Sequence, residues 1–89
     1  ESPKAYRVSV PSPNPFRAQT QIEIEAGQPQ HGRVAVYDLF GRLVAVVHDG
    51  PLGAARTFAI DGSAWPSGVY VLRVTGETFH DTRLLTLAR

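Results

Sequence analysis

Residues 65–74 read Trp-Pro-Ser-Gly-Val-Tyr-Val-Leu-Arg-Val, and this stretch decides the fold of the chain. A tight polar corner closes with Gly68, and an apolar run follows it at once. Apolar runs of this length, rich in valine and bounded by Gly and Pro, are typical of β-strands. The stretch therefore predicts a corner that opens directly into a strand over Val69–Thr75.

The rest of the chain repeats this organisation of short strands between turn residues. Thr20–Ala26 alternates strictly, so its isoleucines face a core and its glutamates face water. No segment keeps a helical period free of Gly and Pro, and no connection is long enough for a helical crossover. The pattern predicts an all-β, antiparallel β-sandwich of about seven strands. The expected strands are Tyr6–Val10, Thr20–Ala26, Arg33–Leu39, Leu43–His48, Thr57–Asp61, Val69–Thr75 and Thr82–Leu87.

The phase of the alternating strands also predicts the core and the turns. Turns are expected at Asp38–Gly41, Asp49–Pro51 and Asp61–Ser63, where Asp and Gly favour tight backbone reversals. The prolines of Ser12–Phe16 cannot donate to a ladder, so this segment should cross between the sheets as a loop. The residues expected in the core are Phe16, Ile22, Ile24, Val36, Phe58, Ile60, Tyr70, Leu72 and Val74.

Two strands are apolar on both faces. In the strand that follows the corner, Tyr70 and Leu72 share one face and valines occupy the other, and Leu43–Val47 is built in the same way. Two interpretations stay open. Loops cover the second face of a central strand, or the second face is a patch that docks on a parent domain or another partner.

Composition limits the possible functions. The chain has 89 residues, which is one small domain, with residues 1–5 expected as a linker end and residues 6–89 as the domain. A net charge of +1 gives no basis for nucleic-acid binding. Cysteine is absent, so neither a disulfide nor a thiolate nucleophile is available.

Catalytic and metal-binding patterns are not evident. Three aspartates lie in predicted turns, where backbone hydrogen bonds explain them. His31, His48 and His80 fall on different predicted elements without metal-ligand spacing. Ser63 and Ser67 have no adjacent base and are most simply turn residues. We therefore expect no catalytic, cofactor-binding or metal site, and no enzymatic activity of the domain itself.

Trp65 is the only tryptophan, and two roles are open for it. Together with Tyr37 it can form a sugar-stacking platform, as in carbohydrate-binding modules. It can instead plug the bottom of the sandwich, which Pro66 and Gly68 favour because a fixed turn tucks the ring inward. Tyr70 is placed to donate its hydroxyl to upstream backbone, in the manner of a tyrosine corner.

Four blocks of sequence carry a family resemblance. They are Pro13–Phe16 (Pro-Asn-Pro-Phe), Val36–Arg42 (Val-Tyr-Asp and then Gly-Arg), Ser67–Tyr70 (Ser-Gly-Val-Tyr) and the basic–apolar end Arg83–Arg89. In this order and spacing they resemble the C-terminal sorting domain of proteins exported by the type IX secretion system. The resemblance covers about Val10 to Arg89. Related immunoglobulin-like modules occur in flagellar hook-capping proteins.

The resemblance implies a seven-stranded, immunoglobulin-like β-sandwich that is a non-catalytic module of a larger secreted protein. Such a module directs export across the outer membrane of a Gram-negative bacterium, via the periplasm, and attachment to the cell surface. Its implied partners are the outer-membrane secretion machinery, cell-surface components and the parent catalytic domain. The implied recognition residues are Arg83, Leu84, Leu85 and Arg89. The family's end often carries lysines, and the arginines here keep the charge but change the hydrogen-bond geometry.

Two features of Arg83 and Arg89 can be read from the residues alone. They bracket an apolar strand, where charged side chains commonly guard an exposed sheet edge. We expect both to be exposed, so replacing them together by Ala should change stability little. The alternatives to an export role are a carbohydrate-binding module and a structural spacer of a multidomain secreted glycoside hydrolase.

Overall fold

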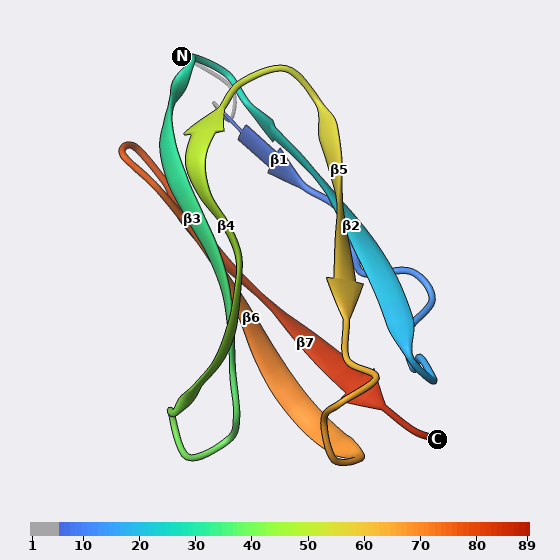
Figure 1. Ribbon diagram of the computed structural model, residues 1–89. Coiled ribbons are helices and arrows are strands. Elements are labelled where there is room, and N and C mark those ends of the chain that lie inside the picture. Colours follow the sequence, from blue (N-terminus) through green and yellow to red (C-terminus); the bar gives the residue numbers. More distant parts are fainter. Residues whose placement is uncertain (1–5) are drawn as a thin grey trace.

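The computed structural model describes residues 6–89, which form two antiparallel sheets packed face to face (Figure 1). The expected linker end at residues 1–5 lies outside the described residues. One sheet has the strand order β1-β2-β5 and the other β4-β3-β6-β7. The strands are β1 Tyr6–Val8, β2 Gln19–Ala26, β3 Gln30–Tyr37, β4 Leu43–Leu52, β5 Arg56–Asp61, β6 Gly68–Gly76 and β7 His80–Leu87. The expected all-β sandwich of about seven strands is confirmed.

The connection between β4 and β5 is the point where the chain changes sheets in its middle. β4 pairs with β3, whereas β5 pairs with β2 in the other sheet. In constant-type immunoglobulin domains the fourth strand instead joins the sheet of the first, second and fifth strands. The four-stranded sheet of this chain is therefore wider, and it has edges at β4 and β7.

The core lies between the sheets and is built by the alternation seen in the sequence. All nine expected core residues are buried, among them Ile22 and Ile24 of β2 and Leu72 and Val74 of β6. Seven more residues, from β1, β2, β3, β4, β7 and the β6–β7 loop, complete the same cluster. These further members are Val8, Ala26, Val34, Leu52, Phe79, Leu85 and Leu87.

The expected turn at Asp49–Pro51 is wrong, because β4 continues through it to Leu52. Gly50 pairs with Gly32 of β3, and Pro51 pairs with His31. Proline is tolerated there because β4 is an edge strand, so no neighbouring strand needs the missing N–H. The turn residues of this segment are thus part of a ladder.

Two other expectations about loops are confirmed. The N–H of Ser63 donates to Asp61 Oδ1 at 3.0 Å, which closes the predicted Asx turn. Ser12–Phe16 crosses between the sheets, since Ser12 pairs with Gln21 of β2 and Phe16 pairs with Leu87 of β7.

Residues 6–89 contain no helix with the length and apolarity needed to cross a bilayer.

Candidate functional site

The four blocks of sequence described above meet at one end of the sandwich, the lower end in Figure 1. Tyr37 pairs with Val71, so the β3–β4 hairpin and the start of β6 lie at the same end of the four-stranded sheet. The N–H of Phe16 donates to the carbonyl of Thr86 at 2.8 Å, which joins the first block to the last strand. Positions far apart in the sequence therefore form one structural unit.

The first block closes the free edge of β7. Asn14 Nδ2 donates to the carbonyl of Leu84 at 2.9 Å, and the N–H of Thr86 donates to Asn14 Oδ1 at 2.8 Å. A carboxamide offers one donor and one acceptor, as a peptide group does. The side chain of Asn14 therefore takes the place of a neighbouring strand, and β7 presents fewer open backbone groups than an ordinary edge strand would.

The second block is a hairpin turn organised by one carboxylate. Asp38 Oδ1 accepts the N–H groups of Phe40 and Arg42 at 2.9 and 3.0 Å, and Asp38 Oδ2 accepts Arg42 Nε at 2.8 Å. Gly41 has φ +83, a conformation that favours glycine. The N–H of Arg42, then its side chain and the N–H of Phe40, hold the pKa of Asp38 below its ordinary value.

The third block is the corner before β6, and its polar groups also form hydrogen bonds within the domain. The hydroxyl of Tyr70 donates to the carbonyl of Pro66, as expected for a tyrosine-corner arrangement. Trp65 packs on the ring of Tyr70 at 5.1 Å and against the core. A Cβ atom added at Gly62 would lie 2.9 Å from the indole, so glycine leaves room for Trp65.

The fourth block contains Arg83, which is not a solvated rim charge. Its side chain is 27% exposed, Nη1 lies 2.6 Å from Asp81 Oδ1, and Nη2 donates to the carbonyl of Val8 at 2.7 Å. Val8 belongs to β1, so Arg83 ties one edge of each sheet together. The premise that Arg83 is a solvated charge is therefore wrong, and a larger stability effect is expected, because removal of this residue leaves Asp81 and the Val8 carbonyl without their partner.

Asp81, the carboxylate partner of Arg83, stays ionised at this contact between the two sheets. Partial burial favours the neutral acid, but the N–H of Thr82, the guanidinium of Arg83 and the hydroxyl of Tyr6 outweigh it. The pKa of Asp81 is consequently lowered from its ordinary value. Tyr6 lies in β1, so the pair formed by Asp81 and Arg83 contacts the three-stranded sheet at two residues.

The other residues of the implied recognition set differ in how accessible they are. Leu85 is fully buried, whereas Leu84 is 58% exposed on the outer face of the sheet. Arg89 is exposed, but its guanidinium donates to the carbonyls of Gly62, Ser63 and Trp65. Of the four residues, Leu84 therefore offers a side chain that is open to a partner and not engaged by the domain itself.

Trp65 and Tyr37 are not brought together. Trp65 lies beside Tyr70, whose side chain points into the core. Tyr37 pairs with Val71, the next residue along β6, whose side chain points to the opposite face. The two aromatic rings consequently lie on different faces of the sheet and do not form one platform.

The histidines and carboxylates are dispersed. Within the described part of the chain, no group of three His, Asp or Glu side chains is close enough to hold a metal ion. His31 Nε2 lies 2.6 Å from Asp49 Oδ1, and His48 Nε2 lies 3.0 Å from the carbonyl of Pro51 and packs its ring on Phe58. Each has a local structural partner.

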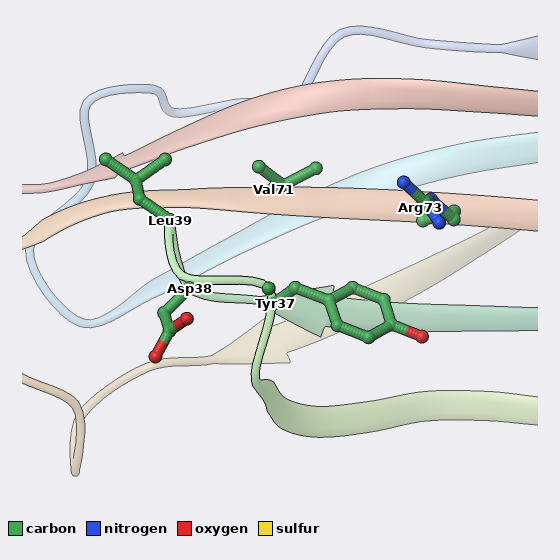
Figure 2. A pocket seen from close by; sticks show the side chains of 6 residues that line it. Tyr37, Asp38, Leu39, Val71 and Arg73 are labelled. Carbon is green, nitrogen blue, oxygen red and sulfur yellow. The ribbon is translucent and has the colours of Figure 1, made fainter.

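An exposed apolar surface was not predicted at the tip of the β3–β4 hairpin. Leu39 is 66% exposed and Phe40 is 85% exposed. Together with Tyr37, Val71 and Arg73, Leu39 borders a shallow hollow of about 280 Å³ on the outer face of the four-stranded sheet (Figure 2). The sequence signal for it was an apolar pair inside a polar turn, where solubility alone would favour hydrophilic residues.

The model of one protein family matches the chain. Its description is secretion system C-terminal sorting domain, and it matches residues 12–86. No curated protein and no solved structure matches the chain.

Proposed function

Since the chain belongs to the family of C-terminal sorting domains of the type IX secretion system, we propose that it directs a larger protein across the outer membrane and then serves its attachment to the cell surface. The domain contributes no catalysis to this process. Its partners are the outer-membrane secretion machinery, components of the cell surface and a parent catalytic domain. The route runs through the periplasm of a Gram-negative bacterium.

One observation supports recognition of the folded domain in preference to recognition of a linear sequence motif. The blocks that carry the family resemblance use their polar groups inside the domain: Asn14 on β7, Asp38 on Arg42 and Tyr70 on Pro66. Groups engaged in this way are not free to bind a receptor. The blocks therefore define the shape of the domain, and the receptor contacts side chains that this shape exposes, with Leu84 as the accessible member of the fourth block.

The proposal is tested by fusing the chain to the C-terminus of a periplasmic reporter in a host that has the secretion system. We expect the reporter on the cell surface or in the medium. A matched fusion carrying Ile24→Asp places a charge in the core, so it should unfold the domain and leave the reporter in the periplasm. Retention of the reporter in the periplasm with a natively folded wild-type domain would contradict the proposal.

The carbohydrate-binding alternative is tested by the fluorescence of Trp65, the only tryptophan. We expect xylan, cellulose and mannan to leave the emission unchanged, because the indole packs on Tyr70 and the core. Retention on a polysaccharide column that is lost in a folded Trp65→Ala variant would support the alternative.

A further inference from the structure

The outer face of the four-stranded sheet is an apolar surface that the domain itself leaves uncovered. Side chains paired across antiparallel strands lie on the same face. The register therefore places one row of apolar side chains across all four strands. This row is Leu43 of β4, Tyr37 of β3, Val71 of β6 and Leu84 of β7.

The neighbouring positions extend this row. Val46 of β4 is 46% exposed and pairs with Ala35, and Leu43 and Leu84 are 51% and 58% exposed. Figure 2 shows Val71 between Leu39 and Arg73, with the ring of Tyr37 extending toward Arg73. Contiguous apolar surface of this kind usually marks an interaction site on a folded domain. We call these positions and the hairpin tip with Phe40 the outer apolar face.

The two charged side chains that contact Tyr37 on this face are both positive. Arg33 Nη1 donates to the hydroxyl of Tyr37 at 3.0 Å, and the guanidinium of Arg73 lies 5.6 Å from the centre of the same ring. Neither arginine has a carboxylate partner within residues 6–89. Asp49 lies opposite Arg33 on the same face but contacts His31, and Asp38 at the hairpin tip contacts Arg42. The centre of this face, around Tyr37, is therefore complementary to a partner surface that is apolar and carries carboxylates.

The two edges of the sheet differ in a way that orients such a partner. The edge at β7 is closed by Asn14, Phe16 and Arg83. β4 pairs with β3 on one side and, among residues 6–89, with no strand on the other. Half of the backbone groups of an edge strand point away from its sheet and can pair with an added strand. The open edge adjoins the exposed side chains of Leu43 and Val46.

We infer that the outer apolar face is where the export machinery docks, through a protein partner that adds a strand to β4 and lays an apolar, acidic surface over Tyr37 and Arg73. This inference rests on the proposed function and names the surface that performs it. Main-chain pairing at β4 supplies a binding mode that tolerates variation in the partner's side chains. Carboxylates over Arg33 and Arg73 fix the orientation of the partner.

Site-directed photocrosslinking in secreting cells tests the occupant directly. A photoreactive amino acid replaces Val46 in the exported fusion, and Ala59 is the matched control, since it is exposed on β5, an edge strand of the other sheet. We expect cross-links from position 46 to a protein segment that contains Asp or Glu, and none from position 59. Cross-links to lipid, to a second copy of the chain or equally from both positions would overturn the inference.

Charge reversal provides a second measurement. Arg73→Glu should lower the surface fraction of the reporter by about tenfold, because carboxylates would then face each other across the interface. Arg56→Glu is the matched control, since Arg56 also lies over an aromatic ring, that of Phe58 at 4.7 Å, but in the other sheet. It should export normally. Thermal melting of both purified variants confirms that they are folded.

The results separate this inference from the function on which it rests. If the wild-type fusion stays in the periplasm, the proposed function is contradicted. If the wild-type fusion reaches the surface and a folded Arg73→Glu variant does so equally well, the docking surface is contradicted and the export role stands.

Discussion

The side chain of Asn14 shows how single residues give this domain its shape. It completes the ladder of β7 with one donor and one acceptor, where a second strand would otherwise be needed. Asp38 organises the hairpin tip and Tyr70 secures the corner before β6. The sequence suggested the turn at Asp38 and the hydroxyl bond of Tyr70, because both bonds are local. The partner of Asn14 lies 70 residues away, so no local pattern could reveal it.

Replacing Asn14 by Ala should destabilise the domain by about 1–2 kcal/mol, since two hydrogen bonds to β7 are lost at a partly solvated edge. Urea denaturation measures the effect. Arg17→Ala is the control, because Arg17 is exposed in the same segment and its side chain has no hydrogen bond within residues 6–89; its stability should lie within about 0.5 kcal/mol of wild type. Equal stabilities of the two variants would show that solvent replaces Asn14 without loss.

Arg83→Ala should destabilise the domain by about 1.5–3 kcal/mol, the range for hydrogen bonds to charged groups. The guanidinium bonds both Asp81 and the carbonyl of Val8, and lysine cannot reproduce this two-pronged contact. Arg83→Lys should therefore recover only part of the loss. Thermal melting of the two variants checks the order. Full recovery by lysine would mean that charge alone holds β1 to β7.

At the scale of elements, β2 and β4 show where sequence patterns succeed and where they fail. β2 alternates strictly, and its expected faces are confirmed. The end of β4 contains Asp49, Gly50 and Pro51, which favour a turn locally. Tertiary pairing with β3 overrides that preference, since Gly50 fits against Gly32 and Pro51 lies on an edge. The seven strands were foreseeable from local sequence, but the length of β4 depends on its neighbour.

The paired glycines of β3 and β4 should respond differently to alanine. A Cβ atom at Gly32 would lie 2.1 Å from Leu52 Cδ1, whereas one at Gly50 would meet nothing nearer than 3.5 Å. Gly32→Ala should cost about 1–3 kcal/mol because Leu52 must leave its buried position. Gly50→Ala should be neutral or stabilise by up to about 1 kcal/mol. Chemical denaturation of both variants decides the matter, and similar losses would contradict the packing described for Leu52.

At the scale of the whole molecule, the two faces of the four-stranded sheet have separate roles. The inner face builds the core, and its members were read correctly from the alternation. The outer face carries apolar residues that nothing in the described chain covers, such as Val46 and Leu84. The sequence showed that these strands are apolar on both sides. It could not show whether loops cover the second side, because that depends on where the loops run.

Acid should destabilise the whole domain. Three aspartates have a lowered pKa in the folded domain. The backbone N–H of Arg42 lowers the pKa of Asp38, and the backbone N–H of Ser63 lowers the pKa of Asp61. At Asp81 burial raises the pKa, but the Thr82 N–H, Arg83 and Tyr6 outweigh it, so the pKa is lowered there too. A lowered pKa in the folded state adds stability above the unfolded value of 3.8, and this stability is lost as the pH falls through the folded value.

The measurement is the urea midpoint between about pH 6 and pH 2. We expect the urea midpoint of the wild type to decrease once the pH is lower than about 4. The difference in urea midpoint between the wild type and Asp38→Asn should shrink in the same range, because the variant lacks one of the titrating groups. A wild-type midpoint that stays constant over this range would contradict the lowered pKa values.

The hydrogen bonds of Asn14 and Phe16 to β7 also determine when the domain can finish folding during synthesis. Residues 12–16 leave the ribosome about 70 residues before their partners Leu84, Thr86 and Leu87. Leu85 and Leu87 also fill the core, so the sandwich stays incomplete until β7 has been made. A chain that stops short of β7 therefore lacks the finished shape. The folded domain accordingly shows that translation has passed β7.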